Sequence, residues 1–241
     1  MINKIRAIVS KELKGYFNSP IAYIVTGIFL VAMSVLYLLK DYSYAFRIAD
    51  LQQYFSYIPW VFILIIPAIT MRSWAEERKV GTEEILLTLP FRETELVVGK
   101  FIAPLVLLFF MLVLTLSIPF TLSFLGDFEA GQVIGRYLGV LFFGASCISI
   151  GLFISSLTDN QIISFFATAM ILFFLVIISD INQLIAFPPA LKGIFNWISF
   201  RYHYDTLSSG LIQTKDLFFF VITSVVFLFL NVKVLVLRKW Q

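Results

Sequence analysis

The chain has 241 residues, of which 60% are hydrophobic and only 14% are charged, and its mean hydropathy is +0.93. Soluble domains contain about a quarter charged residues, so this composition excludes a soluble globular protein and predicts an integral membrane protein. The formal net charge of +3 is small, so the positions of Lys and Arg are more informative than their number. The single cysteine, Cys147, lies in an apolar run, which excludes a disulfide framework and a thiolate metal site.

Residues 1–19 predict a helix that lies along the membrane surface. Apolar residues recur at spacings of three or four, and basic residues occupy the other faces, as expected of an interfacial amphipathic helix. The stripe consists of Ile2, Ile5, Val9, Leu13 and Phe17, and the basic residues are Lys4, Arg6, Lys11 and Lys14. The alternative is a plain positive flank of the first span. We expect no cleavable signal peptide, because the following apolar run lacks a small-residue cleavage pattern.

Six apolar segments are long enough to cross a hydrocarbon core about 30 Å thick. We place them at approximately 21–39, 54–71, 101–125, 135–157, 161–180 and 217–237. Twelve of the 18 Lys and Arg residues lie before the first span, between the second and third spans, or at the C-terminal end from Lys233 onward. The positive-inside rule therefore predicts that both termini and the 72–100 loop lie in the cytoplasm.

The spans contain features of packing rather than of chemistry. Pro67, Pro104 and Pro119 predict kinks, although membrane helices also tolerate proline without a hinge. The fourth span contains the small-residue pairs Gly135/Gly139 and Gly151/Ser155, which allow helices to approach closely.

No ionisable residue lies deep inside a predicted span. Arg136 and Asp180 stand at span ends, where they could reach headgroups or water. Ion-coupled transporters and intramembrane proteases need buried ionisable groups, so this pattern argues against both classes.

Between the fifth and sixth spans, the external segment 181–216 contains two apolar stretches too short to span. They are Ile181–Phe187 and Ile194–Phe200, separated by Pro188 and Pro189. We interpret them as a re-entrant or interfacial pair.

The aromatic residues Trp197, Tyr202 and Tyr204 in the same segment suit a membrane interface. His203 lies close to Asp205, but a lone histidine with one carboxylate is a poor metal-ligand set. We favour a structural role for His203.

The segment from Met71 to Lys100 is the longest strongly polar tract of the chain. It predicts two short helices separated by Gly81, which can adopt backbone angles closed to other residues, and ended by Pro90. Thr82, followed by two glutamates, suits a helix start. A simple connection would be much shorter, so we expect this segment to dock onto another protein, with Lys100 anchoring the start of the third span at the headgroups.

The chain has no nucleotide-binding loop of its own. The phosphate-loop pattern G-x-x-x-x-G-K-[ST] does not occur, since Gly99-Lys100 is followed by Phe101 and lacks the preceding glycine. Any ATP-driven activity would therefore need a separate nucleotide-binding partner.

The chain resembles the membrane subunits of type-2 ABC exporters in three blocks: SKELKGYFNSPIAY, MRSWAEERKVGTEEILLTLP with the following VVGK, and ISFRYHYDTLSSGLIQTKDLFFF. Within that family it is most similar to the permeases of the gliding-motility and copper-maturation type, and the resemblance covers essentially the whole chain, 1–241, as one transmembrane domain. It implies an all-α integral membrane fold with six spans. It also implies an N-terminal interfacial elbow helix, a cytoplasmic coupling helix in 72–100, and short external helices between spans five and six.

The resemblance further implies a surface that docks onto an ATP-binding subunit. Its residues would be Glu76, Glu77, Gly81, Thr82, Glu83, Leu86, Leu89 and Pro90. The charges would orient docking, and the leucines would fill a pocket of the partner.

The implied partners are two copies of the ATP-binding subunit, which would hold ATP and Mg²⁺, and a second permease copy or paralogue. An accessory membrane subunit with an external domain is a further candidate, and we expect no nucleic-acid partner. The chain itself would bind no cofactor and catalyse no reaction. Its expected location is the bacterial cytoplasmic membrane.

Three functions compete at this point. The first is a permease that exports or extracts a substrate when ATP closes its partner subunits. The second is a mechanotransmission or signalling unit that acts on an external partner while nothing crosses. A continuous cavity at the dimer interface would favour the first, and a closed hydrophobic seam the second. The third, a membrane enzyme, lacks clustered His, Asp or Glu at membrane depth, and we favour the permease.

The docking hypothesis predicts the effect of charge reversal. Replacing Glu83 and Glu84 with lysine should weaken co-purification of the ATP-binding subunit and leave membrane insertion intact. Unchanged co-purification together with unchanged stimulated ATPase activity would contradict the assignment.

Overall fold

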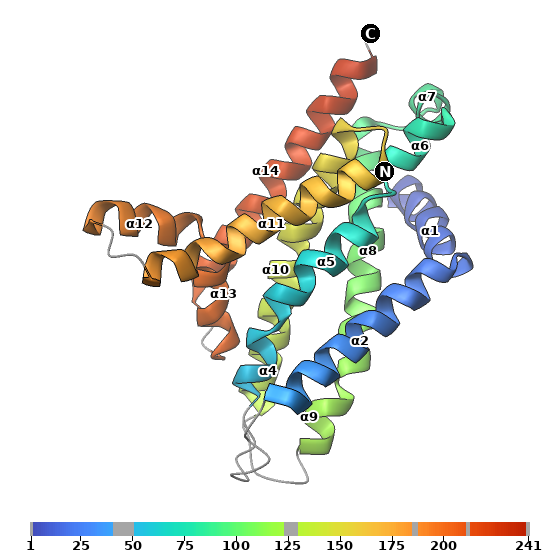
Figure 1. The fold of residues 1–241 in the computed structure, drawn as a ribbon. Coiled ribbons are helices and arrows are strands. Elements are labelled where there is room, and N and C mark those ends of the chain that lie inside the picture. Colours follow the sequence, from blue (N-terminus) through green and yellow to red (C-terminus); the bar gives the residue numbers. More distant parts are fainter. Residues whose placement is uncertain (1, 41–50, 123–129, 185–187, 211–212, 240–241) are drawn as a thin grey trace.

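A computed structural model describes residues 2–40, 51–122, 130–184, 188–210 and 213–239, and every regular element in these ranges is a helix (Figure 1). The helices are α1 (Ile2–Asn18), α2 (Pro20–Lys40), α4 (Gln52–Ser56), α5 (Ile58–Thr70), α6 (Ala75–Val80), α7 (Thr82–Thr88), α8 (Glu93–Thr115), α9 (Ser117–Leu122), α10 (Ala130–Leu157), α11 (Gln161–Leu184), α12 (Pro189–Ile198), α13 (Phe200–Ser208) and α14 (Thr214–Lys239).

Six of the described segments are long and apolar enough to cross a membrane, which confirms the all-α class and the predicted number of spans. They are Pro20–Tyr37, Ile58–Val80, Glu93–Thr121, Gly131–Leu157, Gln161–Ile181 and Thr214–Lys239. The side on which each end lies stays a prediction.

Proline accounts for one of the breaks within these segments. The proline ring displaces the carbonyl four residues earlier, and Pro119 lies four residues after Thr115, where α8 ends. Pro67 and Pro104, by contrast, lie inside continuous helices. Of the three predicted kinks, therefore, only the one at Pro119 produces a break in the helix.

The helix α10 is the centre of the bundle. It contacts α5, α6, α8, α11, α13 and α14, most extensively α14. A Cβ atom on Gly151 would overlap the Thr70 side chain of α5, and one on Gly139 would overlap Leu207 of α13. The small residues predicted to mediate close packing do so at both positions.

Aromatic rings from several helices meet around Phe143 of α10. Phe143 of α10 stacks on Phe62 of α5, with ring centroids 5.7 Å apart. Its ring also lies 5.0 Å from that of Tyr204 and 5.8 Å from that of Phe220. The cluster thus joins α5, α10, α13 and α14.

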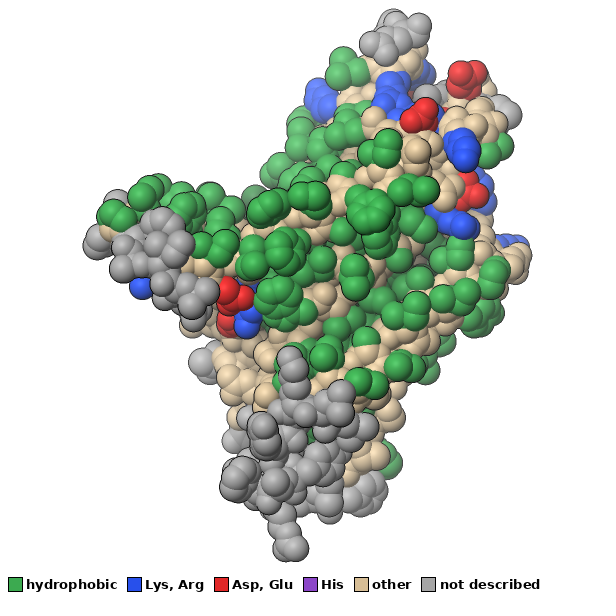
Figure 2. Space-filling view, in the orientation of Figure 1, with side chains coloured by type: hydrophobic (Ala, Val, Ile, Leu, Met, Phe, Trp, Pro, Cys, Tyr) green, Lys and Arg blue, Asp and Glu red, His purple; other side chains and the backbone are tan. Residues whose placement is uncertain are grey.

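Apolar side chains cover much of the outer surface (Figure 2). Exposed apolar residues lie along α2, α8, α11 and α14, as expected of helices that face lipid. Charged side chains gather instead around the end of the bundle where α6, α7 and both termini lie (Figures 1 and 2).

Several helices extend beyond the apolar runs that predicted them. The helix α8 begins at Glu93 rather than near residue 101, and α11 continues through Ile181 to Leu184. The stretch Ile181–Phe187 is therefore not a separate short helix, and residues 185–187 lie outside the described part. Near their ends these longer helices contain Lys100, Arg136 and Asp216, all buried, so the prediction that Arg136 reaches headgroups or water is wrong. An apolar run stops at the first charge, whereas a helix continues where that charge finds a partner.

The packing at Gly151 predicts a specific cost. Gly151→Ala should lower the free energy of unfolding by about 1–3 kcal/mol, the usual cost of overpacking, because the added methyl group must displace Thr70 of α5. The measurement is an unfolding titration of the purified protein in mixed micelles. Gly27→Ala on α2 is the matched control, since a Cβ atom there meets nothing within 4 Å. Equal stability of the two variants would contradict the close approach of α5 and α10.

Candidate functional site

Two short helices, α6 and α7, form a hairpin at the charged end of the bundle. We call residues 74–89 the α6–α7 hairpin. Gly81 joins its helices with φ 78° and ψ 7°, a left-handed conformation that favours glycine. The second helix ends at Thr88, and Leu89 is extended (ψ 154°), as expected of a residue before proline. The sequence predicted this two-helix organisation from Gly81 and Pro90.

A serine of α10 holds the start of the hairpin. The hydroxyl of Ser155 accepts hydrogen bonds from the backbone N–H groups of Trp74 and Ala75, each at 3.2 Å. It also donates to the carbonyl of Met71 at 3.1 Å. These are backbone groups that the break between α5 and α6 leaves without helical partners. Ser155 therefore fixes α6 to α10.

A second attachment to α10 runs through Arg78. Its guanidinium donates to both carboxylate oxygens of Glu83, at 2.8 and 3.3 Å, and to the carbonyl of Ser156 at 2.6 Å. Arg238 of α14 lies 3.8 Å from the same carboxylate. Glu83 was predicted to face a partner, but its side chain is only 9% exposed and its contacts are within the chain.

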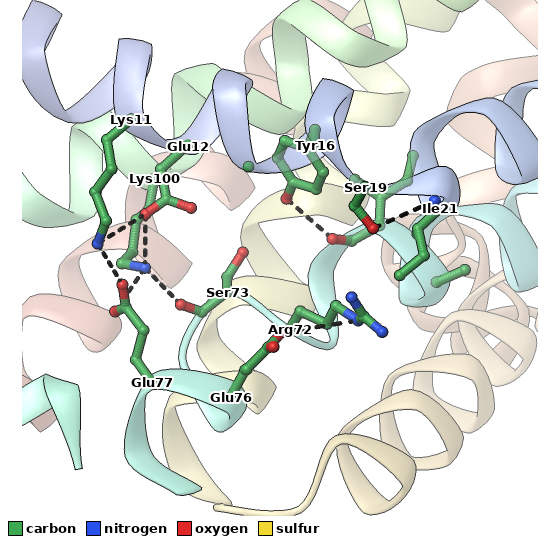
Figure 3. Close-up of a pocket in the computed structure, with 13 residues that line it drawn as sticks. Lys11, Glu12, Tyr16, Ser19, Ile21, Arg72, Ser73, Glu76, Glu77 and Lys100 are labelled. Atoms are coloured by element: carbon green, nitrogen blue, oxygen red, sulfur yellow. Dashed lines mark hydrogen bonds and ion pairs between the residues drawn. The ribbon is translucent and has the colours of Figure 1, made fainter. Parts of the chain in front are cut away.

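A buried lysine connects the hairpin to α8 and α1 (Figure 3). The ammonium of Lys100 lies 2.7 Å from Glu77 and 3.1 Å from Glu12. Glu77 also accepts a hydrogen bond from Lys11 at 2.8 Å. Glu77 thus links α6 to two other helices at once, and we call Lys11, Glu12, Glu77 and Lys100 the Glu77 network.

Lys100 does not reach the headgroups as predicted. Its side chain is 2% exposed, it donates to the carbonyl of Ser73, and its Nζ lies 4.6 Å from the centroid of the Trp74 ring. Since α8 begins two turns before Lys100, the residue is carried into the bundle. There the carboxylates of Glu12 and Glu77 compensate the charge.

Two side chains of α1, Lys11 and Tyr16, have pKa values that this environment raises. Burial opposes the charge of Lys11, but the hydrogen bond from Lys11 to Glu77 and the charges of Glu77 and Glu12 outweigh it and raise the pKa of the ammonium. Burial also raises the pKa of the Tyr16 hydroxyl, which donates to the carbonyl of Ile69 at 3.0 Å. Both contacts hold α1 against the junction of α5 and α6.

The predicted docking residues divide into two groups. Glu77 and Glu83 are engaged inside the protein, and the hydroxyl of Thr82 donates to the carbonyl of Glu77. Leu86 is half-buried, and Glu76 makes a loose contact with Arg72 at 3.8 Å. The outward group consists of Gly81, Leu89 and Pro90, all exposed, and Glu84, which was predicted only as a position for charge reversal, is exposed among them. Val80, which the sequence did not single out, is 68% exposed beside them.

The predicted external residues differ in their surroundings. Trp197 is 70% and Tyr202 40% exposed. Tyr204 is fully buried and donates to the carbonyl of Phe55 at 2.8 Å. It is therefore a core residue rather than an interfacial one, because it lies on the face of α13 that packs against α10.

His203 contacts Asp216 of α14 at 2.7 Å rather than Asp205. Its other ring nitrogen lies 3.1 Å from the Trp197 carbonyl, and its ring stacks on Phe219 with centroids 4.0 Å apart. These contacts tie α13 to α14. No group of three or more His, Cys, Asp or Glu that could hold a metal occurs in the described ranges.

The residues that hold the hairpin in place were not predicted from the sequence. Lys11 and Arg78 were counted only as charges, Glu12 was not singled out, and Ser155 was taken only as a small packing residue. The pairing of Glu12 with Lys100 spans 88 positions, and no local pattern indicates it. The one available signal was a lysine within an otherwise helical, apolar stretch, which needs a partner if it is buried.

The model of the family described as "ABC-2 family transporter protein" matches residues 6–238, nearly the whole chain. No curated protein matches the chain.

The Glu77 network predicts unequal roles for its two lysines. Lys100→Met should destabilise the protein by about 3 kcal/mol, the lower end for a broken buried ion pair, because the largely buried carboxylates of Glu12 and Glu77 then keep only the exposed Lys11 as a cation. Lys11→Met should cost no more than about 1 kcal/mol, since the Lys11 side chain is 58% exposed. Chemical unfolding of both variants in the same detergent measures the difference. A Lys100 variant as stable as the Lys11 variant would contradict the buried network.

Proposed function

The chain belongs to the ABC-2 family of transporter proteins, and on that premise we propose that its α6–α7 hairpin receives the movement of an ATP-binding subunit and passes it to the spans, so that a substrate is exported or extracted. Family membership makes the chain a multi-pass permease component of an ABC transporter that works with an ABC ATP-binding subunit. The hairpin, its docking and its direction of action are the proposal.

The observation that carries this proposal is the attachment of the hairpin to four other helices. Ser155 and the Ser156 carbonyl fix it to α10, and Arg238 reaches it from α14. The Glu77 network fixes it to α1 and α8. A loop that only joined two spans would not need these contacts, whereas a loop that transmits force does.

The outward face of the hairpin supplies a docking surface. Val80 and Leu89 are large exposed apolar residues at its tip and end, and Glu84 adds an exposed negative charge. Apolar anchors provide affinity, and a rim charge contributes orientation and association rate. The internal ion pairs keep this face in one orientation before the partner binds.

In the proposed mechanism, two ATP-binding subunits close on ATP and Mg²⁺ and displace the hairpins of two permease copies, or of a permease and a paralogue. Because α6 is bonded to α10, the displacement moves the central helix as a rigid body. The hairpin and both termini would lie in the cytoplasm of a bacterium, with the spans in its cytoplasmic membrane. The gliding-motility and copper-maturation type, and an accessory subunit with an external domain, belong to the same proposal.

Charge reversal at Glu84 tests the docking surface without disturbing the fold. Because Glu84 is exposed and Glu83 is bonded internally, Glu84→Lys alone is a cleaner variant than a change at both positions. We expect about tenfold weaker binding of the ATP-binding subunit, or about 1.4 kcal/mol, together with less stimulated ATPase activity. Quantitative co-purification and ATPase assays in nanodiscs measure both.

The matched control is Asp159→Lys, which reverses an exposed charge outside the hairpin, between α10 and α11. It should leave binding unchanged. Equal loss in both variants would indicate a general charge effect, and no loss in Glu84→Lys combined with Leu89→Asp would contradict docking at the hairpin.

A further inference from the structure

A cavity of ≈ 340 Å³ lies beside the Glu77 network, where α1 turns into α2 (Figure 3). Its walls come from the second half of α1, the first turn of α2, the end of α5 and the start of α6. Ligand pockets usually have volumes of about 300–1,000 Å³. Its position at the start of one span and the end of another places it at the membrane surface.

The polar side of this cavity has balanced charge. Three cations and three carboxylates line it: Lys11, Arg72, Lys100, Glu12, Glu76 and Glu77. Lys11 and Lys100 both bind Glu77. Arg72 differs, because its Nε is buried without a hydrogen-bond partner and lies 3.8 Å from a Glu76 oxygen. Arg72 and Glu76 are therefore a cation and an anion that are close but not hydrogen-bonded.

The other side of the cavity is apolar and continues along a span. Ile21 of α2 and Ala68 and Ile69 of α5 line it. Ile24 and Ile28 follow Ile21 at helical spacing and are 56% and 57% exposed. An apolar strip thus runs from the cavity along the outer face of α2, in the direction that an acyl chain would take.

We propose that this cavity binds a zwitterionic phospholipid of the phosphoethanolamine type, with its phosphate on Arg72 and its ammonium on Glu76. A guanidinium binds phosphate oxygens well, and basic pockets at the membrane surface recognise lipid headgroups. A purely anionic headgroup would meet the Glu76 carboxylate. A choline headgroup carries no N–H that could donate to that carboxylate. The assignment concerns the permease alone and does not depend on an ATP-binding partner.

Native mass spectrometry of the purified protein in detergent tests the site. Phosphatidylethanolamine, phosphatidylcholine and phosphatidylglycerol with identical acyl chains are the probes, added separately and in competition. We expect retention of one phosphatidylethanolamine in preference to the other two. Arg72→Gln should weaken it about tenfold, the factor that corresponds to about 1.4 kcal/mol, which is near the lower end for a hydrogen bond to a charged group.

Two glycines provide a matched steric pair. Gly15 lines the cavity, and a Cβ atom there meets nothing within 4 Å, so Gly15→Leu should fill the cavity and abolish retention. Gly27 is equally open but lies outside the cavity, so Gly27→Leu should retain the lipid. Lipid bound by Gly15→Leu as by the parent protein would overturn the assignment.

Glu76→Gln separates recognition from folding. It should lower retention of phosphatidylethanolamine and raise that of phosphatidylglycerol, a change of preference that misfolding cannot produce. Equal binding of the ethanolamine and choline lipids, or preference of the parent protein for phosphatidylglycerol, would overturn the zwitterionic assignment. Displacement of the lipid by an equal concentration of free phosphoethanolamine or inorganic phosphate would assign the site to a soluble phosphate instead.

Discussion

The buried ammonium of Lys100 is the constraint on which this end of the bundle depends. A charge taken out of water is tolerated only where opposite charges and hydrogen-bond acceptors surround it. Here the acceptors come from α1, α6 and the turn at Ser73, so these elements must meet at one point of α8. The preceding residue, Gly99, completes the arrangement, because a Cβ atom there would overlap Ile8 of α1. Glycine allows α1 to approach, and lysine holds it.

Adjacent turns of α10 also combine a glycine that allows close approach with a polar side chain that holds the neighbouring segment. Gly151 lets α5 pack closely through Thr70, and Ser155, one turn later, binds the backbone that follows α5. The chain can therefore leave α5, break its helix and start α6 without losing backbone hydrogen bonds. A break buried without such a partner would leave unpaired polar groups at considerable cost. The hairpin is thus attached to α10 by hydrogen bonds as well as to α5 by the chain itself.

The sequence predicted what short-range patterns determine. Apolar length located the six spans, and Gly81 with Pro90 predicted the hairpin, since each effect acts within a few residues. It did not predict which charges meet, because Lys100 and Glu12 come together only through packing of α1 on α8. The same holds for His203, whose true partner Asp216 lies beyond the nearer Asp205. The ends of the spans were misplaced for the same reason, because a prediction based on apolar runs assumes that every charged residue is exposed.

The end and the middle of α10 make different kinds of contact, and this bears on how the hairpin could act at a distance. Ser155 binds the hairpin, while Phe143, twelve residues earlier and so about 18 Å along the helix, contacts Tyr204 of α13 and Phe220 of α14. Tyr204 in turn donates to the Phe55 carbonyl, before α5 begins. A rigid α10 that moved with the hairpin would therefore shift an aromatic core that joins α5, α13 and α14. Close-packed cores change between discrete arrangements rather than deform gradually, so such a shift would reposition α13, and with it the α12–α13 segment, as one step.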